Sequence, residues 1–269
     1  LGCVLLLVFI GMLFVVSAGS VSAERIGQPW HYFMLKMMPF YIIGLITLFA
    51  ASMLNKKWVL RISALNVIVG MALLPLTIVH PYIIKGSKRF VHLLGFNVMP
   101  ADIMKPGFII LTAWFLARMS EKFGDKMFTC RDAWRLEWLS WWTYLALFLP
   151  ALLIIFRHPD VGTAMLYMAV LCAMLFIAGL PWKFFAGLVA LIPLGITTAF
   201  FTMGHVHRRI MTLLTGDGDN YQVTQSIQSI QHGGLLGSGD DAFVKQSLPD
   251  AHTDFIFAAI AEDVGAIIA

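Results

Sequence analysis

The chain has 269 residues, of which 59% are hydrophobic and only 13% are charged, and its formal net charge is +4. A soluble domain carries about 25% charged residues, because it needs a polar shell toward water. The composition therefore excludes an ordinary soluble domain. The basic residues form no single stripe, which argues against nucleic-acid binding, and the three cysteines have neither disulfide nor metal-ligand spacing.

Apolar runs recur along the chain, and most approach the roughly 20 residues that a membrane-spanning helix needs. The predicted spans are 1–18, 36–54, 62–79, 100–118, 139–156, 161–178 and 184–203, and an eighth begins near residue 253. The fourth is the weakest, because Asp102 and Lys105 lie in its first turns. We therefore predict an all-α polytopic membrane protein, a single transmembrane domain over residues 1–269.

The two ends of the chain need their own interpretation. Residues 1–18, followed by Val21, Ser22 and Ala23, look like a signal peptide with its cleavage site. No basic segment precedes the apolar run, and the chain that follows is itself apolar, so a first spanning helix is favoured. Because the chain begins at Leu1 and stops within an apolar run, we expect a piece of a longer protein that lacks both ends.

The connections predict which side each loop faces. The alternating spans leave nine Lys and Arg residues in the loops of each side, so their number alone does not decide the orientation. The short loops 55–61 and 118–138 hold dense basic clusters and are therefore placed in the cytoplasm. Loops 80–99 and 204–252 then lie outside. A loop as long as 204–252 is usually functional or disordered, and its apolar residues favour function.

The most distinctive motif closes the long loop, at residues 248–255 (Leu-Pro-Asp-Ala-His-Thr-Asp-Phe). Asp254 is expected in the first turn of the eighth helix, near the membrane interface. A carboxylate there can simply cap free N–H groups and gain from the helix dipole. The alternative is a general base, since an ionisable group at a membrane boundary is a functional candidate.

Basic residues on the predicted outer side form a second constellation. Lys85, Lys88 and Arg89 lie in loop 80–99, Lys105 lies just inside the next span, and Arg208 and Arg209 open the long loop. Lysine and arginine side chains suit phosphate groups. The same residues can instead reach toward anionic lipid headgroups, and composition alone does not separate the two interpretations.

Two further motifs have simpler structural interpretations. Asp160 stands at the start of the span 161–178 and can cap that helix. The glycine-rich run 233–239 (Gly-Gly-Leu-Leu-Gly-Ser-Gly) is not a phosphate-binding loop, because no Gly-Lys-Ser/Thr follows and no strand precedes it. It is expected to form a hinged or tightly turned element.

Taken together, these runs resemble the SEDS family (shape, elongation, division and sporulation). The runs that carry the resemblance are 86–89 (Gly-Ser-Lys-Arg), 159–165 (Pro-Asp-Val-Gly-Thr-Ala-Met), 209–212 (Arg-Ile-Met-Thr), 221–226 (Tyr-Gln-Val-Thr-Gln-Ser), 233–239 and 248–257. Each run is weak, whereas the set in this order is specific. The Tyr-Gln-x-x-Gln-Ser run favours the division branch of the family.

The resemblance implies a bundle of ten spans and a peptidoglycan glycosyltransferase that polymerises lipid II, the undecaprenyl-pyrophosphate-linked disaccharide peptide, on the outer face of the bacterial inner membrane. The implied partners are a class B penicillin-binding transpeptidase, other division proteins at the septum and membrane lipid. The implied catalytic acid falls on Asp254. The candidate substrate-binding residues are Lys85, Lys88, Arg89, Phe90, Lys105, Asp160, Arg208, Arg209, His252 and Thr253.

The chain departs from the family pattern at two places. Phe90 stands where the pattern has tryptophan, which keeps an aromatic face and removes the indole N–H donor. Residues 99–102 read Met-Pro-Ala-Asp where the pattern reads Gln-Pro-Ser-Glu. Both changes affect groups expected to position the substrate.

The implied reaction inverts the anomeric carbon, and by analogy with inverting glycosidases Asp254 would activate the acceptor hydroxyl. The cations would stabilise the leaving pyrophosphate. No motif requires a metal or another cofactor, although a divalent cation bridging pyrophosphate and carboxylate fits the chemistry. Two alternatives are a transporter that moves lipid II between leaflets and an inactive scaffold of the division machinery.

Overall fold

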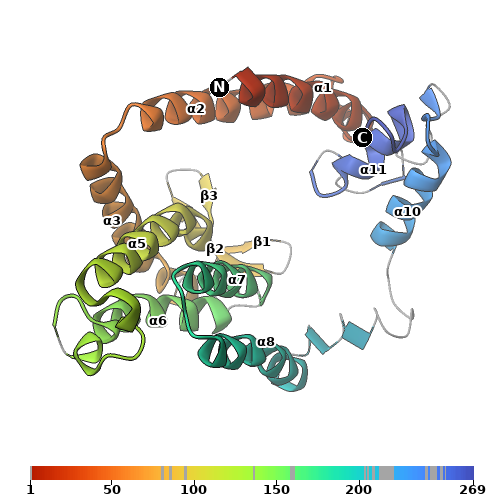
Figure 1. Ribbon diagram of the computed structural model, residues 1–269. Helices are drawn as coiled ribbons and strands as arrows, with labels where there is room; N and C mark the ends of the chain where they lie inside the picture. Colours follow the sequence, from red (N-terminus) through yellow and green to blue (C-terminus); the bar gives the residue numbers. More distant parts are fainter. Residues whose placement is uncertain are drawn as a thin grey trace. The chain divides into compact units, whose positions relative to one another are not determined.

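The computed structural model describes residues 2–79, 82–84, 87–93, 96–135, 137–157, 161–202, 204, 206–207, 210–211, 221–239, 242, 247–248, 251 and 253–269. The chain forms two compact units, one made of Leu1–Met53 with Met211–Ala269 and the other of Leu54–Ile210. Helices dominate both of them (Figure 1).

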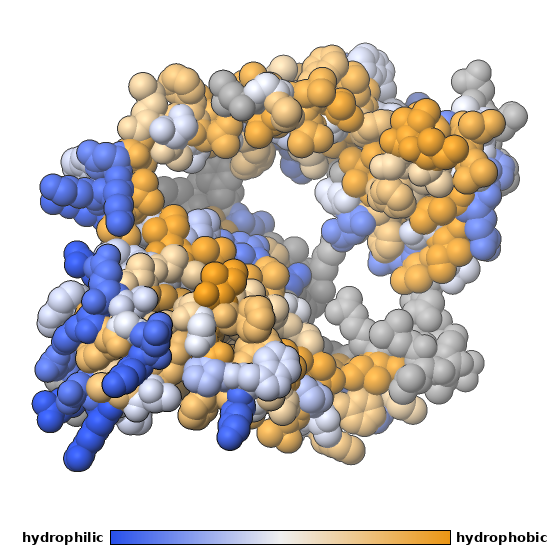
Figure 2. Space-filling view, in the orientation of Figure 1, coloured by the Kyte–Doolittle hydropathy of each residue, from blue (hydrophilic) through white to orange (hydrophobic). Residues whose placement is uncertain are grey.

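The first unit contains four described helices (Figure 1). They are α1 (Gly2–Arg25), α2 (Tyr32–Ser52), α10 (Tyr221–Gly233) and α11 (Ile256–Val264). Helix α10 lies inside the predicted long loop, so part of that loop is helical. None of the residues of α2 is buried. Figure 2 shows hydrophobic side chains along α1 and α2, as expected for helices whose solvent is lipid.

The second unit contains most of the remaining elements (Figure 1). They are α3 (Lys56–Leu73), α4 (Leu76–Val79), β1 (Tyr82–Ile84), β2 (Ser87–Leu93), β3 (Phe96–Val98), α5 (Pro100–Phe123), the 3-10 turns η1 (Gly124–Lys126) and η2 (Arg131–Trp134), α6 (Trp141–Arg157), α7 (Val161–Ile177) and α8 (Trp182–Thr202). Figure 2 shows hydrophilic side chains gathered over the segment that follows α5.

A helix occupies each of the seven predicted spans. Within the described residues, four helical segments are long and apolar enough to cross a membrane by length and composition: Gly2–Arg25, Tyr32–Ser52, Lys56–Val79 and Trp182–Thr202. Trp141–Ile155 and Gly162–Ile177 are apolar but shorter. The predicted span 62–79 is interrupted between α3 and α4, where Pro75 lacks an N–H and its ring crowds the preceding turn.

The prediction of an all-α fold is wrong for residues 82–84, 87–93 and 96–98, which form a small three-stranded antiparallel sheet in the order β1-β2-β3. Tyr82 pairs with Phe90, and Val91 pairs with Val98. Two glycine-containing connections of two residues separate these three short runs, and such spacing is typical of hairpins. The sheet contacts α4 and α5 through β2.

Helices α3 and α5 pack closely through small residues. A side-chain carbon added at Gly107 would lie 2.5 Å from Asn66 Oδ1 and 2.8 Å from the Ser63 carbonyl oxygen, so only glycine permits this approach. Small residues allow spanning helices to come this close. Beyond this contact, Phe108, Phe115, Tyr144, Phe148 and Tyr167 belong to one buried aromatic core that joins α5, α6 and α7.

The segment between α5 and α6 is held by an exposed ion pair, with Lys122 Nζ 2.7 Å from Glu137 Oε2. The hydrogen bond from Lys122, together with its charge, lowers the pKa of Glu137. A carboxyl whose pKa is lowered in the folded state stabilises that state above its unfolded pKa, and this contribution disappears as the pH falls through the folded pKa.

We therefore expect acidification below about pH 4 to lower the amide protection factors of residues 124–137 of the wild type, that is, the ratio of the intrinsic exchange rate at that pH to the observed rate. A Glu137→Gln variant should show the lower protection factors already at neutral pH and respond less to acid. The same acid response in both proteins would contradict a role for this pair.

Candidate functional site

The cationic part of the predicted site begins on strand β2. Arg89 and Phe90 are both partly buried there, and the Arg89 guanidinium lies 5.6 Å from the centre of the Phe90 ring. A cation over an aromatic face is attracted by the ring quadrupole. The departure from tryptophan therefore keeps the aromatic surface on which this arginine rests.

Lys105 lies one turn inside α5, beside a second charged group. Its Nζ is 2.5 Å from Asp102 Oδ1, and both side chains are partly exposed. Lys105 also borders a hollow of about 220 Å³ whose other lining residues are Phe108, Ile109, Leu166, Tyr167 and Val170. A lysine at the edge of an apolar hollow can bind a phosphate whose lipid chain lies beyond it.

The structure places only part of the predicted cation set in one unit. Arg89 on β2 and the start of α5 belong to one unit, in which β2 and α5 are in contact. Lys88 lies on β2. The remaining predicted positions, Lys85, Asp160, Arg208, Arg209 and His252, lie outside the described residues.

Asp254 belongs to the other unit, where it is exposed although residues on both sides of it in the chain are buried. Leu248 and Ala251 are buried, with exposed fractions of 0% and 1%, in an apolar cluster with Ala258, Ala259 and Ala18 of α1. Thr253 and Asp254 are exposed between these anchors. The predicted catalytic carboxylate is therefore available at the surface of its unit.

The expected place of Asp254 in the first turn of the helix is wrong. Helix α11 begins at Ile256, its first turn contains no acidic residue, and its N-cap, Phe255, makes no capping hydrogen bond through its side chain. The Phe255 carbonyl accepts the hydrogen bond from the Ala259 N–H, which leaves Asp254 one residue before the N-cap and two before the first residue of the helix. This position weakens the interpretation of Asp254 as a cap.

Sequence reasoning overlooked two acidic residues further along α11. Glu262 is fully buried, and its Oε1 lies 3.1 Å from Nδ1 of His232 on α10. Asp263 Oδ2 accepts a 2.6 Å hydrogen bond from Ser17 Oγ of α1. The sequence signal for them was a pair of acidic residues at the end of an apolar run, because a carboxylate that is buried there needs a hydrogen-bonding or charged partner. Together the two residues fix α11 against α10 and α1.

The glycine-rich run 233–239 forms the tight turn that was predicted. Gly237 has a φ of +88°, and a side-chain carbon added there would lie 2.4 Å from the Asp263 carbonyl oxygen. The Ser238 N–H also donates a 2.8 Å hydrogen bond to the Glu262 carbonyl oxygen. The run therefore packs against the end of α11 and supports the helix that follows Asp254.

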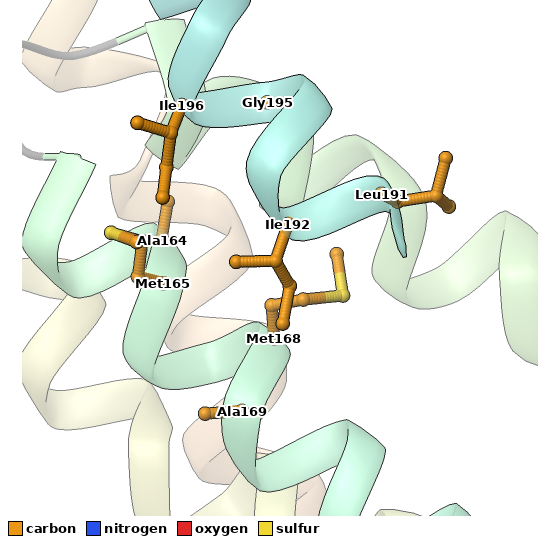
Figure 3. Close-up of a pocket in the computed structure, with 8 residues that line it drawn as sticks. All are labelled: Ala164, Met165, Met168, Ala169, Leu191, Ile192, Gly195 and Ile196. Carbon is orange, nitrogen blue, oxygen red and sulfur yellow. The ribbon is translucent and has the colours of Figure 1, made fainter. Parts of the chain in front are cut away.

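A different hollow, of about 210 Å³, lies between α7 and α8. Figure 3 shows its lining, which consists of Met165, Met168, Ile192 and Ile196 together with other apolar residues and Gly195. Such a lining has no donor, acceptor or charge for sugar or phosphate chemistry. The hollow beside Lys105 is therefore the better candidate for a substrate contact.

No group of three or more metal-ligand side chains is found in the part of the chain that the structure describes. The expectation that no metal is required stays a prediction.

Comparison with known proteins supplies independent evidence of kinship. The chain is 31% identical over 99% of its length to the probable peptidoglycan glycosyltransferase FtsW of Caulobacter vibrioides, and covers 66% of that protein. It is 32% identical over 97% of its length to the protein of the same name from Thiomicrospira cyclica, again covering 66% of it. The chain thus spans just under two thirds of the length of these relatives.

Solved structures agree with this fold. A chain from a peptidoglycan synthase complex, described for its coordination of polymerization and crosslinking, matches with a TM-score of 0.68 at 21% identity, over 99% of this chain and 71% of that one. The rod shape determining protein RodA of Thermus thermophilus matches with a TM-score of 0.59 at 21% identity, over 99% and 67%. The Cell cycle protein profile of FtsW, RodA and SpoVE matches residues 1–268. The chain therefore belongs to the FtsW/RodA/SpoVE family of cell cycle proteins, which confirms the SEDS resemblance.

Proposed function

We propose that the complete protein is a peptidoglycan glycosyltransferase that polymerises lipid II during bacterial cell division. Family membership and the names of the relatives support this activity. The structural observation that carries it is the exposed carboxylate of Asp254, held between buried anchors in the motif 248–255. An exposed acid with fixed neighbours suits a general base.

In the proposed reaction, Asp254 accepts the proton of a sugar hydroxyl on the acceptor strand. The hydroxyl oxygen forms a bond with the anomeric carbon of the donor sugar, and the bond from that carbon to the pyrophosphate oxygen breaks. Attack from the face opposite the leaving group inverts the anomeric centre from α to β. Undecaprenyl pyrophosphate leaves with the bonding electron pair.

The leaving pyrophosphate carries its own negative charge, so it needs cations more than a proton. Arg89 and Lys105 are the candidates whose side-chain contacts the structure describes, and Lys85, Lys88, Arg208 and Arg209 extend the proposed set. Phe90, Asp160, His252 and Thr253 would orient the sugar and phosphate groups. The scheme requires no cofactor, and a divalent cation between the pyrophosphate and the carboxylate is compatible with it.

The proposed location is the bacterial inner membrane at the division septum, with the segment 204–252 on the periplasmic side. The proposed partner is a class B penicillin-binding transpeptidase, which would crosslink the strands that this protein makes. The structural likeness to a chain of a peptidoglycan synthase complex supports a partnership of this kind.

Reversing both charges at Arg208 and Arg209, by substitution with glutamate, should weaken lipid II binding at least tenfold. Each charge-assisted hydrogen bond contributes about 1.5–3 kcal/mol, and about 1.4 kcal/mol corresponds to a factor of ten. Binding would be measured on the purified full-length protein in detergent. The same reversal at Lys56 and Lys57 is the matched control, because these residues are predicted on the cytoplasmic side and their reversal should leave lipid II binding by the correctly inserted protein unchanged. Unchanged binding in the Arg208 and Arg209 variant would contradict the clamp.

A polymerisation assay in detergent separates the proposed enzyme from its two alternatives. A transporter needs a membrane to cross and ionisable groups near its midplane, and a scaffold needs no chemistry. The full-length protein with its partner would be given lipid II in micelles. Glycan strands support the proposal, and their absence under conditions where the partner still crosslinks added strands would overturn it.

A further inference from the structure

The first turn of α5 is tied to another helix by a buried tyrosine. Tyr167 of α7 is 2% exposed, and its hydroxyl donates a 2.6 Å hydrogen bond to the Ala101 carbonyl oxygen. Its ring packs at a steep angle on Phe108, with the ring centres 4.9 Å apart. One side chain thus contacts α5 at two positions that lie about two turns apart.

In the described part of the chain, the start of α5 makes few hydrogen bonds to other elements, although Met104 also packs against Gly70 of α3. Its N-cap, Met99, makes no side-chain capping hydrogen bond, and the methionine thioether is only a weak acceptor. Pro106 lies inside the helix and has no N–H, so it removes the helical donor to the Asp102 carbonyl. Ala101 likewise has no polar side chain. Among the described residues, the Tyr167 hydroxyl of α7 supplies a hydrogen bond that links this turn to another element.

This turn carries the charged pair of the proposed site. Asp102 follows Ala101 directly, and Lys105 lies one turn later, with Nζ 2.5 Å from Asp102 Oδ1. Tyr167 and Lys105 also line the same hollow of about 220 Å³. A shift of the turn would move the lysine relative to that hollow.

We propose that Tyr167 is a positioning residue, whose hydroxyl holds the first turn of α5 so that Lys105 stays at the mouth of the hollow. The role of Lys105 toward the pyrophosphate rests on the proposed function. Tyr167 itself acts through the Ala101 carbonyl, and its effect should appear in substrate binding more than in the chemical step.

The test compares two tyrosine hydroxyls that both bond to α5. Tyr144 of α6 is also buried, and its hydroxyl lies 3.0 Å from Thr112 Oγ1, deeper along α5 than the Lys105 turn. Tyr167→Phe and Tyr144→Phe each remove one oxygen and keep the ring. Both would be made in the full-length protein with its partner, and KM and kcat for lipid II and Kd for undecaprenyl pyrophosphate would be measured.

Tyr167→Phe should raise KM and Kd about fivefold, the factor equivalent to about 1 kcal/mol for one hydrogen bond, with kcat within about twofold of wild type. Tyr144→Phe should leave KM and Kd unchanged, although both variants lose thermal stability. In a Lys105→Met background, Tyr167→Phe should add no further effect, since coupled residues are not additive.

Equal effects of the two tyrosine substitutions on KM and Kd, or full additivity with Lys105→Met, would overturn the positioning role. Failure of the proposed function gives a different result, in which the wild type makes no glycan. The Kd for undecaprenyl pyrophosphate then decides the inference alone, and wild-type protein that does not bind this probe overturns it.

Discussion

Replacing Asp254 with asparagine should abolish glycan polymerisation while the protein still folds and inserts. The amide keeps the size of the side chain and cannot accept the acceptor's proton, and general-base catalysis contributes about 10²–10⁴-fold to rates. Folding should tolerate the change because Asp254 is exposed and lies outside α11. The measurement is glycan strand length from lipid II, with the full-length protein and its partner in detergent.

Glu24→Gln is the matched control for this experiment. Glu24 is also an exposed acid, near the end of α1, and its neutralisation should leave polymerisation unchanged. Polymerisation at the wild-type rate by the Asp254→Asn protein would remove Asp254 from the mechanism. A loss of activity in both variants would instead point to a general effect of acidic charge.

Replacing Gly237 with alanine should destabilise the unit that carries Asp254 by about 2–5 kcal/mol, which is the sum of two costs. A left-handed backbone costs a non-glycine residue about 1–2 kcal/mol, and overpacking costs about 1–3 kcal/mol. Gly237 meets both conditions, because its φ is +88° and an added carbon would lie 2.4 Å from a backbone oxygen. Thermal unfolding followed by hydrogen exchange in residues 221–239 would measure the loss.

Gly234→Ala isolates the clash from the backbone strain. Gly234 has a φ of +55°, and an added carbon there would meet no atom within 4 Å. Its substitution should therefore show only the backbone cost of about 1–2 kcal/mol. If the two variants lose the same stability, the close packing of the glycine-rich run against α11 is not what holds this unit together.

The sequence predicted the features that depend on local composition. Each of the seven predicted apolar spans coincides with helix in the structure, because a membrane-spanning helix needs a long apolar segment whichever neighbours surround it. Motif order was enough to identify the family and to single out Asp254 as the candidate acid. Glycine content marked the run 233–239 as a tight turn, and Gly237 adopts the positive φ that such a turn needs.

Boundaries and small elements were less predictable. The hairpin signal of residues 82–98 was present but was overlooked beside longer apolar runs, and strand pairing such as Val91 with Val98 depends on register as well as composition. The start of α11 was placed too early, because the motif does not reveal which carbonyl accepts the first helical hydrogen bond. The structure assigns it to Phe255.

Only the tertiary structure decided which distant residues meet. Tyr167 bonds to Ala101, 66 positions earlier in the chain, and Asp263 bonds to Ser17, 246 positions earlier. Hydropathy and turn preference act over a few neighbouring residues and can be read along the chain. A hydrogen bond between helices depends on how their faces pack. It is this packing that lets Tyr167, a residue of an apolar span, support the turn that carries Lys105.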